Sequence, residues 1–135
     1  MLYGAQTWTL TEKTINKLET TQRAMLRSIL NIKRKDKIKN EYIYKKTQIK
    51  NIKNTILKLK WNWAGHIIRL KDERWTKILT EWWPIERKRK RGRQFKRWND
   101  EFKKIAGNEW TRIAKRRTEW KKLGEAYAQT GPGTT

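Results

Sequence analysis

Apolar residues recur along this chain with the period of an α-helix, and no stretch alternates with the two-residue period of a strand. The first such stripe follows Thr11, a residue type that caps helix starts, and Thr9 with Glu12 has the spacing of a capping box. We predict a helix from about Glu12 to Asn31. Its stripe is explained by core packing alone. The stripe consists of Ile15, Leu18, Gln22, Met25, Leu26, Ile29 and Leu30.

A longer stripe predicts a helix from about Asn51 to Leu70, and Asn40 is suited to cap a short helix before it, through Lys46. The stripe contains Ile52, Ile56, Leu59, Trp63, Ile67 and Leu70, widened by Leu57, Ala64 and Ile68. Basic residues lie outside it, on the predicted polar face: Lys50, Lys53, Lys58, Lys60 and Arg69.

Three further helices are predicted in the C-terminal half. The first runs from Trp75 to about Glu81, because a residue before proline is pushed out of the helical region and Pro84 follows Trp82 and Trp83. The second spans about 95–106, where Phe95, Trp98, Phe102 and Ile105 recur at helical spacing. Gly107 is suited to end it and Asn108 to cap the last helix, about 109–128.

The predicted fold class is therefore all-α, a small helical domain of about five to six helices with a basic linker and a disordered C-terminal tail. We divide the chain into an N-terminal helical part, 1–81, a basic linker, 82–94, a C-terminal helical pair, 95–128, and a polar tail, 129–135. The last helix also carries cations on its outer faces: Arg112, Lys115, Arg116, Arg117, Lys121 and Lys122.

Charge changes this picture more than any other property. Lys and Arg number 35 against 13 Asp and Glu, so the net charge is +22. Leu, Ile, Val and Phe together make up about a fifth of the chain, close to the level at which a charged chain tends to be disordered. Nine Trp and four Tyr offset this, because each aromatic side chain buries a large area. We expect a marginally stable fold that is attracted to polyanions.

The most basic stretch is the linker and its C-terminal edge. Eight of the eleven residues from Arg87 to Arg97 are Lys or Arg, and no compact domain buries so many like charges. The stretch is either a solvated loop or a phosphate-contacting segment, and the basic, aromatic composition favours the second. The predicted nucleic-acid-binding residues are Trp82, Trp83, Arg87, Lys88, Arg89, Lys90, Arg91, Arg93, Lys96 and Arg97.

Aromatic residues flank the basic stretch and are placed to stack on unpaired bases. Trp82, Trp83 and Phe95 are the candidates for stacking. Trp98 has helical spacing with Phe102, so core packing is the favoured interpretation for it. If the basic stretch does not contact phosphates, the polar faces of the helices at 51–70 and 109–128 are the next candidates.

The sequence predicts no catalytic site, metal site or cofactor. Cys is absent, and His66 is the only His, with Asp72 and Glu73 as the nearest acid pair. We interpret His66 as a hydrogen-bonded structural residue or a nucleic-acid contact. Two-metal chemistry needs converging carboxylates. Acids such as Asp100 and Glu101 stand beside Arg and Lys, as expected of solvated ion pairs.

No apolar run is long enough to span a bilayer, and no N-terminal signal pattern appears. We therefore expect an intracellular protein. The Arg87–Arg91 run is similar to a short nuclear-import signal, which favours the nucleus.

Seven short motifs occur in an order that resembles the region downstream of the reverse-transcriptase palm in arthropod non-LTR retrotransposons. The resemblance runs from Leu2 to about Gln129. The motifs are Leu2-Tyr3-Gly4-Ala5 with Trp8-Thr9-Leu10-Thr11, Lys60-Trp61-Asn62-Trp63-Ala64-Gly65-His66-Ile67, Arg74-Trp75-Thr76-Lys77, Thr80-Glu81-Trp82, Gly92 to Asp100, Ile105-Ala106-Gly107-Asn108, and Trp110, Arg117, Trp120 with Leu123-Gly124-Glu125-Ala126-Tyr127.

The resemblance implies the thumb-and-tail end of a multidomain endonuclease–reverse transcriptase, without the parts that do chemistry. The sequence has no Tyr-x-Asp-Asp string, which the polymerase palm carries, and the upstream endonuclease is missing. Gln94 stands where the family usually has Pro, so that loop is expected to be less rigid. RNA or DNA, and the upstream reverse-transcriptase domains, are the implied partners.

Three function classes are left open by the sequence. The leading one is a nucleic-acid-binding fragment of a retrotransposon reverse transcriptase that contacts phosphates and is not itself an enzyme. The second is a structural remnant of a decayed transposon without a selected activity, although intact helix patterning argues against long decay. The third is a cationic membrane-surface protein, but its apolar stripes are needed for the core.

Overall fold

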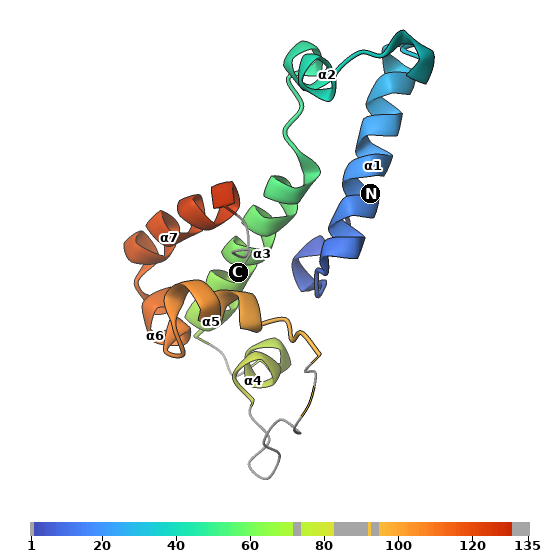
Figure 1. Cartoon of the computed structure of the whole chain (residues 1–135). Helices are drawn as coiled ribbons and strands as arrows, with labels where there is room; N and C mark the ends of the chain where they lie inside the picture. The colour runs from blue at the N-terminus through green and yellow to red at the C-terminus, as the bar shows by residue number, and fades with distance from the viewer. Residues whose placement is uncertain (1, 72–73, 83–91, 93–94, 131–135) are drawn as a thin grey trace.

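A computed structural model describes residues 2–71, 74–82, 92 and 95–130 of the chain (Figure 1). The described residues are all-α, as predicted. Two short 3-10 helices, η1 and η2, accompany seven α-helices. The bounds are η1 Ala5–Thr7, α1 Glu12–Ile29, η2 Arg34–Asp36, α2 Asn40–Thr47, α3 Ile52–Arg69, α4 Trp75–Glu81, α5 Asp100–Ala106, α6 Trp110–Lys115 and α7 Arg117–Thr130.

Helix α3 is the centre of the fold, and it contacts η1, α1, α4, α6 and α7. Asn51 caps its start by accepting the backbone N–H of Lys53 at 2.8 Å, so the predicted helix is confirmed to within a residue at each end. Its buried side extends around more of the helix than the predicted stripe. The buried residues are Ile52, Ile56, Leu57, Lys60, Trp61, Ala64, Gly65, Ile67 and Ile68.

Helix α1 begins as predicted at the Thr11 cap, but the capping box differs from the prediction. Thr11 and Thr14 exchange side-chain and backbone hydrogen bonds at 2.9 and 3.3 Å, so the reciprocal partner is Thr14 and not the Thr9–Glu12 pair. The predicted core stripe also ends early, because Met25 is 50% and Ile29 73% exposed.

The C-terminal half of α1 leaves the core and, with η2 and α2, forms an arm beside the α3 N-terminus (Figure 1). Arg27 of α1 connects the parts of this arm by donating to the Ile38 carbonyl at 2.7 Å and to the Asn40 side chain at 3.0 Å. The C-terminal turns of α1 lie in this arm and therefore do not contact the core around α3.

Helix α2 begins at Asn40 itself, and the residue before it, Lys39, occupies the cap position. The prediction that Asn40 caps this helix was therefore wrong.

Helices α5, α6 and α7 cover the other side of α3. The sequence predicted one helix over 109–128, but the chain breaks at Arg116, whose ψ of 96° is extended. The break lets Trp110 and Trp120 both approach Phe102, at centroid distances of 5.1 and 6.1 Å. Core packing therefore replaced one continuous helix with two.

Helix α5 starts at Asp100, five residues later than predicted. The Asp100 carboxylate accepts the Arg97 backbone N–H at 2.7 Å, and Phe95, predicted to share the helical stripe, is 93% exposed. Gly107 ends the helix with φ 76°, as predicted, because glycine adopts left-handed backbone without strain. The cap before α6 is Glu109, so the predicted Asn108 cap was wrong.

Two tryptophans join α3 and α7, which run antiparallel. The Trp61 and Trp120 rings stack at 4.0 Å, and each indole N–H donates to the other residue's carbonyl, at 2.7 and 3.0 Å. Each ring also lies on a glycine of the opposite helix, Trp120 on Gly65 and Trp61 on Gly124. This reciprocal contact sets the distance and register of the two helices.

One core connects the predicted parts 1–81 and 95–128. It includes Leu10 and Ile15 from the first part together with Phe102 and Tyr127 from the second. Helix α7 continues to Thr130, two residues beyond the predicted end, and 131–135 lie outside the described residues, as does most of the 82–94 linker. Within the described part of the chain, no helix is long and apolar enough to cross a membrane.

Candidate nucleic-acid interface

The predicted basic segment is only partly described by the structure. Trp83, Arg93 and the run Arg87–Arg91 lie outside the described residues. Trp82, at the end of α4, is 65% exposed, and Phe95 is 93% exposed, so both aromatic rings are accessible to a stacking partner. Arg97 is half-buried.

Trp98 packs on the core, as its spacing with Phe102 predicted. The two rings meet edge to face at 4.8 Å, and the Trp98 indole donates to the Gln6 carbonyl at 2.8 Å. The ring is therefore held between η1 and α5. Of the predicted stacking residues that the structure describes, Trp82 and Phe95 have exposed rings.

The ammonium of Lys96 contacts other parts of the fold, whereas a lysine available for a phosphate would be solvated. Its ammonium lies 2.6 Å from a Glu101 carboxylate oxygen and donates to the Leu10 carbonyl at 2.7 Å. Its side chain is 34% exposed. Lys96 thus fastens the start of the C-terminal part to the segment before α1.

Glu101 is at the centre of a buried polar cluster, and the prediction of a solvated ion pair was wrong. Lys60 and Tyr127 both donate to one of its oxygens, at 2.9 and 2.6 Å. Glu101, Lys60 and Tyr127 are fully buried. Lys60 was predicted to lie on a polar face, but its ammonium also lies 5.7 Å from the Trp98 ring centroid and 5.8 Å from that of Phe102.

Burial and charge shift the pKa values in this cluster. Burial alone would raise the pKa of Glu101, but the charge of Lys60 and the hydrogen bonds from Lys96, Tyr127 and Lys60 hold it below its ordinary value. Burial lowers the pKa of Lys60 despite Glu101. Burial and the Glu101 charge raise the pKa of Tyr127, which remains a proton donor. The cluster is a structural connection between α3, α5 and α7.

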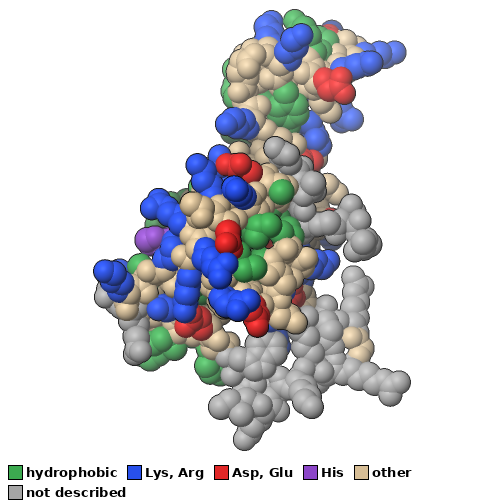
Figure 2. All heavy atoms as spheres, turned by 90° about the vertical axis from the view of Figure 1, so that its left-hand side faces the viewer, with side chains coloured by type: hydrophobic (Ala, Val, Ile, Leu, Met, Phe, Trp, Pro, Cys, Tyr) green, Lys and Arg blue, Asp and Glu red, His purple; other side chains and the backbone are tan. Residues whose placement is uncertain are grey.

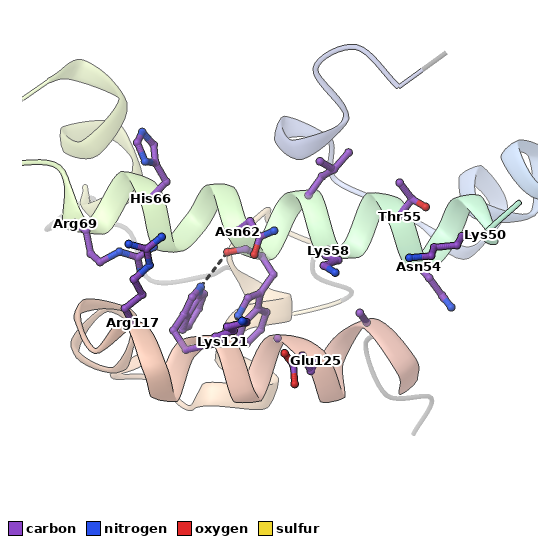
Figure 3. Close-up of a pocket in the computed structure, with 15 residues that line it drawn as sticks. Lys50, Asn54, Thr55, Lys58, Asn62, His66, Arg69, Arg117, Lys121 and Glu125 are labelled. Atoms are coloured by element: carbon purple, nitrogen blue, oxygen red, sulfur yellow. Dashed lines mark hydrogen bonds between the residues drawn. The ribbon is translucent and has the colours of Figure 1, made fainter.

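A groove of about 1080 Å³ runs between α3 and α7 and is lined in part by the two stacked tryptophans (Figure 3). We call it the α3–α7 groove. Its lining combines basic side chains and polar uncharged ones with the edges of the two indoles. The lining residues are Lys50, Asn54, Thr55, Lys58, Leu59, Trp61, Asn62, His66, Arg69, Arg117, Trp120, Lys121, Gly124, Glu125 and Ala128.

Regular spacing places the polar lining residues on facing helix surfaces. On α3 they recur at every fourth position, as Asn54, Lys58, Asn62 and His66, and Lys50 precedes the helix. On α7 the same interval separates Arg117, Lys121 and Glu125. Residues four apart lie one above another on a helix, so each series forms a row along the groove.

The groove is strongly cationic. Five Lys or Arg side chains line it, and Glu125 is the single carboxylate among its described lining residues. Figure 2 shows Lys and Arg side chains gathered on the face that α7 presents. Cations lining a concave surface with low-dielectric walls concentrate positive potential there.

Arg69 and Arg117 approach each other at one end of the groove (Figure 3). Arg69 donates to the Ala114 carbonyl at 2.7 Å, and its guanidinium lies beside Gly65 and the Trp120 ring. Burial, followed by the like charge of Arg117, lowers the pKa of Arg69. Among the described residues, no carboxylate lies within ion-pairing distance of either guanidinium.

His66 lies at the groove edge and stacks on Trp63 at 5.6 Å, with 25° between the rings. It is exposed. In the described part of the chain, no three His, Cys, Asp or Glu residues come together as a metal site would require. His66 is therefore an exposed side chain at the edge of the α3–α7 groove.

Sequence reasoning identified all five of these cations singly but did not join them into a groove. Lys50, Lys58 and Arg69 were placed on one polar face, and Arg117 and Lys121 on another. The interval of four residues within each set could have shown from the sequence that its members form a row on one helix face. What the sequence does not display is the antiparallel pairing of Trp61 with Trp120, which turns the two rows toward one groove.

Comparison with known proteins gives one informative relationship. The chain is 34% identical to an uncharacterized transposon-derived protein of Caenorhabditis elegans, over an alignment of 133 residues that covers 89% of this chain and 48% of that protein. This chain is related to a transposon-derived protein. It spans about half the length of that relative. No family model matches the chain. No solved structure matches it.

Proposed function

We propose that the chain is a nucleic-acid-binding part of a retrotransposon reverse transcriptase, from the region that follows the catalytic palm. In this proposal it contacts the phosphates of RNA or DNA and has no catalytic site of its own. The upstream reverse-transcriptase domains are its proposed partners. The proposed location is the nucleus, where target DNA lies.

The single observation that carries the proposal is the α3–α7 groove. Its five cations face one carboxylate, in a chain of net charge +22. Repulsion among like charges gathered in a groove raises the free energy of the folded state, and a bound polyanion relieves that repulsion. Phosphate contacts by Lys and Arg also release condensed counterions, which favours binding entropically.

The origin of the chain supports the same function. Its relative is named as transposon-derived, and the ordered motifs resemble the post-palm region of non-LTR retrotransposons. Enzymes that copy RNA into DNA hold long nucleic acids outside their catalytic centre. A basic domain beside the palm fits that requirement.

The basic segment 87–97 is the proposed second contact region. Its run Arg87–Arg91 lies outside the described residues, but the exposed ring of Trp82 precedes the segment and that of Phe95 lies within it. Exposed aromatic side chains beside cations are the elements with which proteins hold unpaired nucleotides. The proposed segment and the α3–α7 groove would act together on one nucleic acid.

Titration of fluorescently labelled oligonucleotides over a series of salt concentrations tests nucleic-acid binding. The expected result is a linear fall of log K with log salt, because each neutralised phosphate contributes a slope of about −0.7 on single strands and −0.9 on duplex. Anionic and neutral liposomes at matched ionic strength provide the comparison. Tighter binding to anionic liposomes than to oligonucleotides would contradict the proposal and favour the membrane-surface alternative.

Primer extension and plasmid nicking with Mg²⁺ or Mn²⁺ test the proposed absence of catalysis. The expected result is no turnover above a mock preparation, because two-metal chemistry needs converging carboxylates. Turnover that copurifies with the protein and is lost in Asp100→Ala or His66→Ala would overturn this part of the proposal.

The relative's name also favours a second candidate, a transposon remnant without a selected activity. Such a remnant would not be expected to keep five cations facing one groove once selection on binding stopped. Oligonucleotide binding no stronger than that of an unrelated protein of equal charge would favour the remnant.

A further inference from the structure

We propose that the α3–α7 groove binds one extended single strand of nucleic acid, with Arg69 and Arg117 holding the same backbone phosphate at its end. This inference rests on the proposed function, and it adds the class of ligand and a specific contact.

The floor of the groove is closed by direct helix contact. Trp61 lies against Gly124 and Trp120 against Gly65, so the two backbones are held as close as the indole rings allow. Packed helices have axes about 8–10 Å apart. By contrast, the major groove of a duplex, about 12 Å wide, itself admits a whole helix. Because the two helices touch along this floor, a ligand lies in the groove over it, where a single strand can contact both walls and a double helix can present only one edge.

The walls offer contacts at a regular interval along the strand. Four residues of helix rise about 6 Å, which is comparable to the distance between neighbouring phosphates of an extended strand. The α3 row places Lys58 between the amides of Asn54 and Asn62, and Lys50 lies just before the helix. The cations suit phosphates, and the amides both donate and accept hydrogen bonds, which suits sugars and base edges.

The end of the groove holds two guanidinium groups without a counter-charge among the described residues. Arg69 is fixed in place by its 2.7 Å bond to the Ala114 carbonyl. Arg117 reaches toward it from α7 (Figure 3). A phosphate between them would remove their mutual repulsion, and the planar fork of each guanidinium matches phosphate geometry. Little side-chain entropy is lost on binding, because Arg69 is already oriented.

Competition separates single-strand from duplex binding. A labelled single-stranded DNA of about twelve nucleotides is bound to the full chain and displaced by unlabelled single-stranded DNA, single-stranded RNA or blunt duplex DNA. Both single strands are expected to compete about tenfold better than duplex or more, since a duplex can present only one edge to the groove. The two single-strand arms show whether RNA or DNA is preferred.

Substitution tests the shared phosphate. Arg117→Gln, Arg69→Gln and the double variant are each expected to flatten the single-strand salt slope by the same amount, about 0.7, because the one phosphate is bound only when both guanidinium groups hold it. Arg69→Lys keeps the charge but loses the fork, so its slope should stay while its affinity falls. Lys13→Gln, on the exposed outer face of α1, is the charge-matched control and is expected to change neither quantity. Circular dichroism confirms that each variant is folded.

The outcomes distinguish this inference from the proposed function. If duplex competes as well as single strands, or if the two arginine effects add to about 1.4, the single-strand clamp is overturned while nucleic-acid binding stands. If no oligonucleotide binds, both the inference and the proposed function fail.

Discussion

At the scale of single residues, the fold depends on two Trp-x-x-x-Gly sequences, Trp61 to Gly65 and Trp120 to Gly124. The spacing can be seen in the sequence, but its meaning appears only when the helices pair. Each glycine lies under the other helix's indole, and no space for a methyl group is left. Without that contact, neither groove wall would be where the structure places it.

Gly65→Ala and Gly124→Ala should each destabilise the protein, although alanine normally favours a helix over glycine. An added Cβ would lie 2.4 Å from an indole atom in either case, so the rings must move. Overpacking of this kind costs about 1–3 kcal/mol of unfolding free energy. Chemical denaturation measures the loss. Ser28→Ala, exposed near the end of α1, is the control, and equal stabilities of all three variants would contradict the packing account.

The buried Lys60–Glu101–Tyr127 cluster is the residue-scale feature that sequence reasoning read wrongly. Lys60 falls outside the apolar stripe of α3, and Glu101 stands in a charged stretch, so local pattern places both in solvent. They are buried because residues 41 positions apart supply each other's charge. Such a pairing has no local signal, since it depends on how α5 lies on α3.

Glu101→Gln should lower stability by about 3–5 kcal/mol near neutral pH, because the substitution leaves a buried ammonium without its counter-charge. The folded pKa of Glu101 lies below its ordinary value of 4.5, so its stabilising effect is present above that pH and is lost as the pH falls through the folded pKa. The stability difference between variant and wild type should therefore shrink in acid.

Denaturation at several pH values checks this expectation. The double variant Lys60→Met/Glu101→Gln removes the uncompensated charge and should recover part of the loss. A difference that grows in acid, or a double variant less stable than Glu101→Gln alone, would contradict the role given to the cluster.

At the scale of elements, helix positions could be predicted where local chemistry decides them. Asn51 and Thr11 cap α3 and α1, and Gly107 ends α5, all as their residue types indicate. The break at Arg116 could not be predicted, because it serves the packing of Trp110 and Trp120 on Phe102. The same holds for the α3–α7 groove. The two rows of polar residues could be predicted from the sequence, but not that α3 and α7 pack so that the rows face each other.

The basic run Arg87–Arg91 leads to a prediction at this scale. Replacing all five residues with Gln should weaken binding to every oligonucleotide sequence and flatten the salt slope by roughly 3 to 4 units, if most of the five contact phosphates. The helices should persist, which far-ultraviolet circular dichroism checks. The same change should reduce nuclear accumulation. An unchanged salt slope would assign the phosphate contacts to the groove alone.

At the scale of the whole molecule, the chain has a net charge of +22 and only a small hydrophobic core to stabilise its fold. The arm formed by α1 and α2 buries Leu26 and Ile43 away from the core around α3, and leaves Met25, Ile29 and Tyr42 half exposed or more. The core around α3 must therefore hold together a chain that repels itself. Charge of one sign destabilises a compact state, and salt screens that repulsion.

The isolated chain should consequently be helical and marginally stable, with a melting temperature that rises with salt. Circular dichroism with thermal melting at low and high ionic strength measures both properties. A strand-rich spectrum would contradict the fold. A high melting temperature that does not respond to salt would contradict the charge argument.

The most direct test of the central claim compares two variants that lose the same charge from different faces. One carries Gln at four groove positions, Lys50, Lys58, Arg117 and Lys121, and the other at four exposed positions of the arm and α1, Lys13, Lys17, Lys35 and Lys45. Single-strand affinity and its salt slope are measured for both. If the groove binds the strand, the groove variant loses up to about 2.8 units of slope and the control keeps nearly all of it. Equal losses in the two variants would mean that net charge alone drives binding, and the α3–α7 groove would not be the site.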